Sequence, residues 1–448
     1  MTPEQRLDPD YFPKLSVAVP LSIQHILAMF VSNVTPAIII AGAAGFGPAT
    51  GTSGEVIYMI QSAMLFAGIA TLLQTITVGP VGARLPIVQG TSFAFLPIML
   101  PIAATGGYEA MAILTGGCMA GGLFHATLGF FVGRLRFALP PLVTGLVVAM
   151  IGLSLIKVGI QYAAGGVLLA GTPAYGSLQS WSLAGIVIVV TFGFTFLGRG
   201  LWGTAAILIG LGAGYVAALL MGRVDFSPLA EAGWVAFPEP FHFGFTFSAG
   251  AVLGFCLMGV VSAIETIGDV SALTQTGAGR EATDRELAGA TFADGLGTAV
   301  AGFFGALPNT SFSQNIAVIS MTGIMSRHIV TLGGCILILC GMAPKIGALI
   351  ITIPIEVLGG GVIIMFGMIA AAAIAILSNV NWTQRNMLIF ALSLSLGLGL
   401  QLEPGALQHL PEIAQVLLAS GLLPAAFLAV LLNLVLPEGH TAEATKHS

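Results

Sequence analysis

Charged residues are scarce in this sequence, and the scarcity excludes most soluble folds. They make up 7% of the 448 residues, while hydrophobic residues make up 56%; a soluble protein is about 25% charged. Apolar runs near the roughly 20 residues that cross a bilayer recur throughout, without the alternation of membrane barrel strands. The composition predicts an all-α integral membrane protein in contact with the lipid bilayer. It gives no reason to expect a nucleic-acid partner.

Cysteine is also scarce, and its spacing excludes the common metal sites. The four cysteines all lie inside apolar runs: Cys118, Cys256, Cys335 and Cys340. We expect them to be small buried side chains, with no metal site and no catalytic residue. The first 13 residues lack the apolar core of a cleavable signal, so the first span is expected to insert the chain.

Apolar windows, separated by Gly, Pro and charged residues, predict fourteen spans. Their centres lie near residues 25, 66, 93, 121, 150, 189, 211, 260, 294, 315, 335, 365, 392 and 426. With the amino terminus inside, eleven of the fourteen Lys and Arg residues fall on the cytoplasmic side, as the positive-inside rule requires. These eleven are Arg6, Lys14, Arg84, Arg134, Arg136, Arg199, Arg280, Arg285, Arg327, Arg385 and Lys446. Both termini are therefore expected in the cytoplasm.

A short repeat divides the predicted spans into two sets of seven. Thr-Ser-Phe occurs in residues 90–95 (GTSFAF) and again in residues 309–314 (NTSFSQ), at an offset of 309 − 90 = 219, and each copy follows a Leu-Pro pair. Each copy lies in the third span of its half, and an odd number of spans per half inverts one half relative to the other. Broken spans at matching positions of inverted halves are the best sequence pointer to a transporter's binding site.

The second copy predicts a helix that is broken inside the membrane. Pro308 disfavours a continuous helix, and the hydroxyl side chains after it suit a helix cap. We expect residues 308–313 to be extended and a half-helix to begin near Ser313, with its positive end facing a cavity. For the Ser and Thr residues, a kinked span bonded to neighbouring helices is the alternative. Gln314 and Asn315 together favour a binding site.

Three carboxylates and one histidine lie deep inside predicted spans: Glu265, Asp269, Asp294 and His25. An ionised group there costs at least about 2.5 kcal/mol, so its presence suggests a function. Glu265 and Asp269 are four residues apart and share one helix face, and Glu265 has the placement to carry a coupling proton. A structural hydrogen-bonding role is the alternative for Asp269 and Asp294, as is ordinary packing for His25.

These motifs resemble the nucleobase–ascorbate transporter family over essentially the whole chain. The resemblance lies in QNIAVISMTG (314–323), ETIGD (265–269), QGTSFAF (89–95) and the QH pair of the first span. It implies two inverted sets of seven spans, with short strands and half-helices in spans 3 and 10. It also implies a core domain of spans 1–4 and 8–11 and a gate domain of spans 5–7 and 12–14. The corresponding ranges are 1–140 and 245–350 for the core, 141–244 and 351–436 for the gate, and 437–448 for a cytoplasmic tail.

The resemblance further implies a function and a set of site residues. It implies a homodimeric bacterial inner-membrane symporter that imports xanthine or uric acid with protons by an elevator-type motion, without a cofactor. Glu265 would be the principal substrate carboxylate, with Gln314 as its partner. The residues implied to bind the purine are Glu265, Gln314, Phe93, Ser92 and Asn315. Those implied to support the site or the proton coupling are Glu265, Asp269, Asp294 and His25.

The resemblance leaves the exact purine open. Uracil-selective members tend to carry Gly-Glu where this chain has Ser313 and Gln314, whereas xanthine and uric acid carriers have the Gln-Asn pair found here. Ala317 replaces the usual Gly, and Ile316 is not the Asn of several urate carriers.

The residues themselves fit such a substrate, because glutamine and carboxylate groups can pair with the N–H and C=O edges of an oxidised purine. A symporter of uracil or another nucleobase is one alternative, and an anion transporter or channel on the same inverted-repeat fold is another. The buried carboxylates without Lys or Arg disfavour the anion alternative. An enzyme is not expected, since no nucleophile–base pair or metal-ligand spacing occurs.

Overall fold

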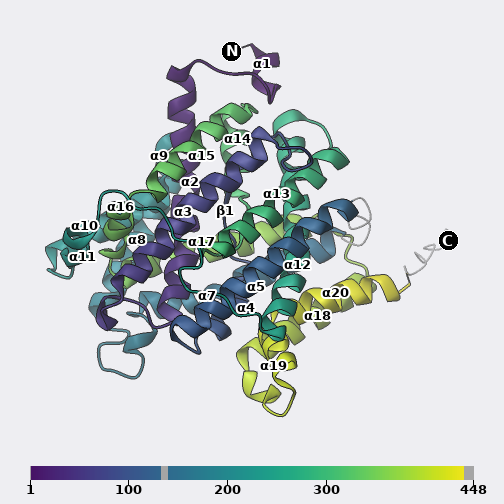
Figure 1. Ribbon diagram of the computed structural model, residues 1–448. Helices are drawn as coiled ribbons and strands as arrows, with labels where there is room; N and C mark the ends of the chain where they lie inside the picture. The colour runs from purple at the N-terminus through teal and green to yellow at the C-terminus, as the bar shows by residue number, and fades with distance from the viewer. Residues whose placement is uncertain (1, 133–139, 438–448) are drawn as a thin grey trace, which may run out of the picture.

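The fold is all α apart from one small two-stranded sheet (Figure 1). The computed structural model describes residues 2–132 and 140–437. The elements before residue 245 are α1 (Pro3–Leu7), α2 (Leu15–Ala43), α3 (Ser53–Ile76), β1 (Gln89–Thr91), α4 (Leu96–Ala103), α5 (Gly107–Leu128), α7 (Pro141–Ala163), α8 (Leu178–Leu197), α9 (Leu201–Thr204), α10 (Ala206–Leu220) and α11 (Ser227–Glu231). Those after it are α12 (Ala249–Ala278), α13 (Asp284–Phe303), β2 (Asn309–Ser311), α14 (Gln314–Thr322), α15 (Arg327–Gly341), α16 (Pro344–Ile351), α17 (Ile355–Leu377), α18 (Gln384–Leu402), α19 (Glu412–Ala419) and α20 (Leu422–Val435).

The helices confirm a multi-pass membrane protein. Within the described residues, eight helices are long and apolar enough to cross a bilayer, and up to ten spans result if each of two bent pairs is one span. The bent pairs are α15 with α16, at 78°, and the end of α19 with α20, at 83°. The remaining predicted spans fall on the short α4 and α14, on the 15-residue α10 and on α13. Length and composition alone therefore do not reach the predicted fourteen.

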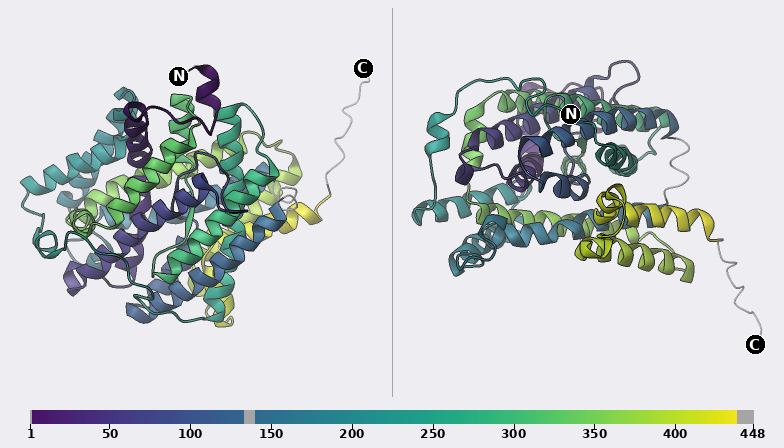
Figure 2. Two further views of the ribbon diagram at one scale, coloured as in Figure 1. Left: turned by 45° about the horizontal axis from the view of Figure 1, so that its top comes forward. Right: turned by 60° about the horizontal axis from the view of Figure 1, so that its bottom comes forward.

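The helices form two layers, which Figure 2 shows edge-on in its right panel. In the first layer α5 packs against α12 and α13, and α3 packs against α15 and α2. In the second layer α7 packs against α17 and α20, and α8 packs against α10 and α17. The chain enters the second layer at α7, returns to the first at α12 and enters the second again at α17.

The two strands lie side by side within the first layer, in contact with α2, α3, α12 and α13. They are antiparallel, with Gly90 opposite Thr310 and Thr91 opposite Asn309. The Thr-Ser-Phe copies align residue 90 with 309 and residue 91 with 310. A two-fold axis between the copies therefore turns the pair 90–310 into the pair 309–91, and both pairs are present. Helix α14 then begins at Gln314 after the N-cap Ser313. The predicted half-helix is confirmed, and the extended segment is confirmed over Asn309–Ser311. Ser313 already has helical dihedral angles, so the extended segment ends earlier than predicted.

Each strand is attached to the long helix that precedes it through the same kind of contact. The backbone N–H of Gln89 donates to Thr71 Oγ1 on α3 at 2.9 Å, and that of Asn309 donates to Thr298 Oγ1 on α13 at 3.0 Å. Asn33 on α2 adds a third attachment, because its Oδ1 accepts from the Thr91 N–H at 2.8 Å. These side chains satisfy backbone groups that lipid cannot.

One expectation about the cysteines is contradicted, and some predicted cytoplasmic residues lie outside the described ranges. Cys118 is buried, but Cys335 is exposed, so the expected burial of Cys335 is wrong. Arg134, Arg136, Lys446 and the tail from residue 438 onward lie outside the described residues.

Glycines allow α5 and α13 to approach closely. A Cβ atom at Gly295 would lie 2.1 Å from the backbone nitrogen of Ala126, and one at Gly122 would lie 2.4 Å from that of Ala299. Backbones in such contact can pack only through small residues, as is common between membrane helices.

Substituting Gly295→Ala should therefore destabilise the first layer by about 1–3 kcal/mol, the usual cost of overpacking. We expect a lower melting temperature of the purified protein in detergent. Gly193→Ala is the matched control, because nothing lies within 4 Å of the added methyl group. Equal melting temperatures for the two variants would contradict the close α5–α13 contact.

Candidate functional site

A cavity of about 850 Å³ lies between the two layers. One wall comes from α12, from β2 and from the start of α14, and the other comes from α7 and α17. Its volume is within the range of small-molecule sites. The polar residues lining the first wall are Glu265, Asp269, Ser271, Thr310, Ser311, Ser313 and Gln314.

Glu265 and Asp269 both face this cavity from one side of α12. Their spacing of one helical turn produces the shared face expected from the sequence. The buried Oε2 of Glu265 has no hydrogen-bond partner among the described residues. Asp269 Oδ2 accepts only a long hydrogen bond, 3.4 Å, from Ser311 Oγ. The two carboxylates therefore retain acceptor capacity for a ligand.

Gln314 and Phe93 complete the cavity wall on the first layer. Gln314 is the first residue of α14, so its amide lies at the positive end of a helix whose first N–H groups have no partner within the helix. The Phe93 ring meets the ring of Phe366 on α17 edge-on, with 5.5 Å between centroids and an interplanar angle of 88°. Phe93 thus lies where the two layers meet.

Four other predicted site residues do not line the cavity: Ser92, Asn315, His25 and Asp294. Ser92 is fully buried and its Oγ has no partner, while its N–H donates to the Pro308 carbonyl at 2.8 Å. Asn315 is buried and its Nδ2 contacts both His25 Nδ1 and the His25 carbonyl oxygen at 3.0 Å. Asn315 and His25 therefore join α14 to α2 behind the site. Neither Ser92 nor Asn315 lines the cavity, so direct contact of either residue with a ligand stays a prediction.

Asp294 is fully buried and forms the centre of a hydrogen-bonded network. It accepts hydrogen bonds from Gln74 Nε2 at 2.8 Å, from Gln89 Nε2 and from Thr266 Oγ1. Gln89 is the first residue of β1, so Asp294 connects α3, α12 and α13 to the strand. This geometry favours the structural reading of Asp294.

Sequence reasoning missed the second-layer wall and several buried polar partners. Thr144 on α7 and Asn379, just after α17, line the cavity opposite Glu265. Glu356 is buried near the start of α17 and pairs with Arg223 at 2.8 Å. The only sequence signals were a polar residue at a span end and a carboxylate beside a Pro-rich link.

The lining chemistry suits a flat polar molecule. The cavity's described lining contains no Lys or Arg, and no group of three or more His, Cys, Asp or Glu residues in the described ranges has the placement to hold a metal. Carboxylate acceptors, the amides of Gln314 and Asn379, and the rings of Phe93 and Phe312 together match a planar ligand with N–H and C=O groups on its edge.

Sequence comparisons match this chain to permeases. The profile of the permease family Xan_ur_permease matches residues 17–405. A Clostridium perfringens protein named as a candidate purine permease is 40% identical over 94% of this chain and 90% of the relative. The uric acid permease PucJ of Bacillus subtilis is 35% identical over 92% and 91% of the two chains. The xanthine permease XanQ of Escherichia coli is 36% identical over 96% and 93%.

A solved structure shares the fold at low sequence identity. The transmembrane domain of the cyanobacterial bicarbonate transporter BicA superposes with a TM-score of 0.60 and 15% identity, covering 93% of this chain and 97% of that one.

Removing the Asp294 carboxylate should destabilise the centre of the first layer. Asp294→Ala leaves the Nε2 of Gln89 without its acceptor inside the membrane, at a cost of about 1–3 kcal/mol for a buried unsatisfied group. Gln74 Nε2 keeps the Ala290 carbonyl as an acceptor, and Thr266 Oγ1 keeps the Ser262 carbonyl. We expect a lower melting temperature and less folded protein. Asp294→Asn keeps one carbonyl acceptor, so its melting temperature should fall less than that of Asp294→Ala. An unchanged melting temperature for Asp294→Ala would exclude the structural role.

Proposed function

We propose a substrate and a coupling ion for this chain, which belongs to the xanthine/uracil permease family. The chain is a nucleobase permease by family. The proposal is that it imports an oxidised purine base, xanthine or uric acid, together with protons.

The observation that carries the proposal is the presence of Glu265 and Gln314 on the same wall of one cavity. A carboxylate accepts from ring N–H groups in charge-assisted hydrogen bonds. A glutamine amide pairs in a bidentate manner with adjacent C=O and N–H groups. Phe93 supplies an aromatic face beside them. An oxidised purine presents all of these features at once.

The choice of a purine over a pyrimidine rests on two kinds of support. The relatives named above are permeases of uric acid and of xanthine, and Gln314-Asn315 occupies the helix start. A carrier of uracil or another nucleobase remains the second candidate. Ile316 and Ala317 line the cavity directly after the helix start, so their side chains are positioned to influence which base fits.

The same proposal includes a mechanism of movement. The first layer corresponds to the core domain, residues 1–140 and 245–350, and the second layer corresponds to the gate domain, 141–244 and 351–436. A cavity between two layers that pack separately is what an elevator-type motion of one against the other needs. In this view α4, α10, α13 and α14 belong to crossing segments, which gives fourteen spans in two inverted sets of seven.

Location and assembly complete the proposal. The cytoplasmic side is the end at which α2 begins and α3 ends, because most Lys and Arg residues lie there. We place the chain in the bacterial inner membrane as a homodimer. Exposed apolar side chains on α8, such as Phe192 and Phe196, suit either lipid or a second copy.

An anion transporter on the same fold is less well supported. BicA resembles this chain in fold alone. The cavity has two carboxylates and lacks a cationic side chain among its described lining residues, an arrangement that repels anions.

Uptake by intact cells tests the substrate. Cells expressing the protein should accumulate labelled xanthine or urate, and unlabelled uracil should compete poorly. Gln314→Ala should weaken purine uptake or binding by roughly tenfold with expression intact, because a bidentate partner of buried polar groups is worth about 1–3 kcal/mol. Uptake of uracil in place of purines would contradict the purine proposal and favour a carrier of uracil or another nucleobase. Unchanged purine affinity in Gln314→Ala would remove Gln314 from the site.

The coupling ion is tested at Glu265. Glu265→Gln keeps the shape and one acceptor but cannot take up a proton, so accumulation driven by a pH gradient should be lost while weak binding persists. Uptake and binding measured over a range of pH, with Asp294→Asn as a comparison, check this expectation. If Glu265→Gln concentrates purine with the pH dependence of the wild type, another group carries the proton.

A further inference from the structure

The segment before α2 lies along the link between α14 and α15. The N–H of Met325 donates to the Arg6 carbonyl at 2.7 Å, and the N–H of Arg327 donates to the Pro9 carbonyl at 2.9 Å. Ser326 Oγ donates to the Tyr11 carbonyl at 2.6 Å. Residues 6–12, which we call the strap, therefore run beside residues 325–327.

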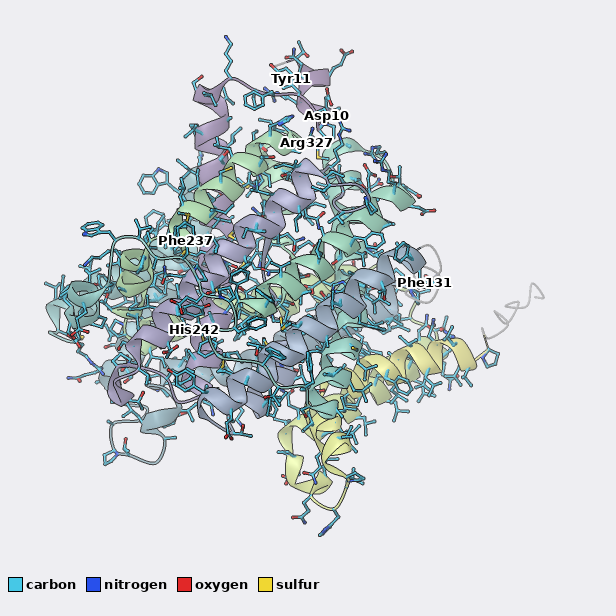
Figure 3. The ribbon with its side chains drawn as sticks, in the orientation of Figure 1. Asp10, Tyr11, Phe131, Phe237, His242 and Arg327 are labelled. Atoms are coloured by element: carbon cyan, nitrogen blue, oxygen red, sulfur yellow. The ribbon has the colours of Figure 1, made fainter. Side chains whose placement is uncertain are left out.

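Asp10 of the strap binds two arginines at once. Its Oδ1 accepts from Arg327 Nε at 2.6 Å and from Arg84 Nε at 3.0 Å. Arg327 also donates from Nη1 to the Thr75 carbonyl at 2.6 Å, at the end of α3. Figure 3 shows Asp10, Tyr11 and Arg327 together at one end of the molecule. The Arg327 side chain is 14% exposed, against 58% for Arg84, so the Arg327 pair is the better shielded of the two.

The two arginines come from the two halves of the chain and stand beside its two broken spans. Arg84 lies in the link from α3 to β1 and has the positive φ angle of 59°, a conformation that is uncommon for a residue with a side chain. The backbone N–H of Arg84 donates a hydrogen bond to the Gln74 carbonyl at 2.9 Å, which holds this conformation. Arg327 is the first residue of α15, just after the end of α14. One carboxylate thus connects the segment that enters β1 with the segment that leaves α14.

We propose that Asp10 is a positioning residue for transport, which fixes the relative placement of β1 and α14 from outside the membrane by bridging Arg84 and Arg327. Helix α14 has nine residues, and Gln314 is the first of them. A tilt at its far end therefore displaces Gln314 in the cavity. The strap contacts elements of the first layer, so it would move with that layer.

The charge state of Asp10 makes the bridge independent of pH under ordinary conditions. Burial alone would raise the pKa of Asp10, but hydrogen bonds and charges from Arg327 and Arg84 lower it below its ordinary value. A lowered carboxyl pKa means that the stabilisation is present above the ordinary carboxyl range and is lost only as pH falls through the lowered value. Disruption of the bridge should hence change substrate affinity without reshaping the pH profile, unlike a change at the coupling carboxylate.

The inference rests on the proposed function, and Asp10→Asn tests it. In purine uptake by intact cells, the variant should raise KM by roughly three- to tenfold, the range expected when a partly shielded charge-assisted contact is lost. The amount of protein in the membrane and the shape of the pH profile should match the wild type. Asp10→Glu should recover most of the affinity because it restores a carboxylate. Glu4→Gln, at an exposed acidic residue of α1, is the matched control and should behave as the wild type.

A double-mutant comparison identifies the contact itself. If Asp10 acts through Arg327, Asp10→Asn combined with Arg327→Gln should raise KM no more than the larger single change. An unchanged KM for Asp10→Asn, or reduced uptake explained by the amount of membrane protein alone, would overturn the inference while leaving purine transport in place. Absence of purine uptake by the wild-type protein would overturn the proposed function and this inference with it.

Discussion

The need to satisfy backbone groups of two strands buried inside the membrane is the constraint on which this structure depends. In a bilayer an unpaired N–H or C=O costs several kcal/mol, and a helix broken at its centre exposes such groups. Here β1 and β2 satisfy part of the requirement by pairing with each other. Hydroxyl and amide side chains on the surrounding long helices, such as Thr71, Thr298 and Asn33, satisfy more of it. Polar residues in otherwise apolar helices are therefore a consequence of the break, and the break is what brings the start of α14 to the cavity.

The buried carboxylates near the strands fall into two kinds, which differ in whether their oxygens have hydrogen-bond partners. Asp294 has three side-chain donors around it and acts as a support for β1. Glu265 lines the cavity with an oxygen that has no hydrogen-bond partner in the part of the chain that the structure describes. A buried polar group that is unsatisfied is costly unless something else binds it, so the cavity is the place where binding of a polar ligand stabilises the protein. The two residues are both carboxylates of first-layer helices, and they differ only in their surroundings.

The local sequence predicted the break well, because Pro308 and the repeated Thr-Ser-Phe determine backbone conformation over a few residues. It also placed Glu265 and Asp269 on one face, since that follows from helical spacing alone. The direction of Asn315 was not predictable, because it depends on how the half-helix α14 is rotated against α2. The direction of Ser92 depends on how the residues after β1 pack against the rest of the fold. The second-layer wall was missed for a related reason: it is mostly apolar, and apolar residues of a membrane helix look alike whether they face lipid or a cavity. Counting spans by length was limited too, since α4 and α14 are half-helices.

The two Thr-Ser-Phe copies show how near-symmetric backbones acquire unequal roles. At the offset of 219 residues, Phe95 occupies the place of Gln314. Phe95 is almost fully buried and packs against Phe255 with 5.6 Å between ring centroids, whereas Gln314 lines the cavity. Gly90 occupies the place of Asn309, and a Cβ there would lie 2.6 Å from the Phe312 ring. The first copy thus has a glycine where the Phe312 ring of the second copy packs. It also contributes an aromatic residue, Phe93, to the cavity. The second copy contributes the amide. Phe312 of the second copy, at the position equivalent to Phe93, also lines the cavity. Both copies therefore place an aromatic ring at the cavity, and the copies differ there in the amide, which only the second supplies.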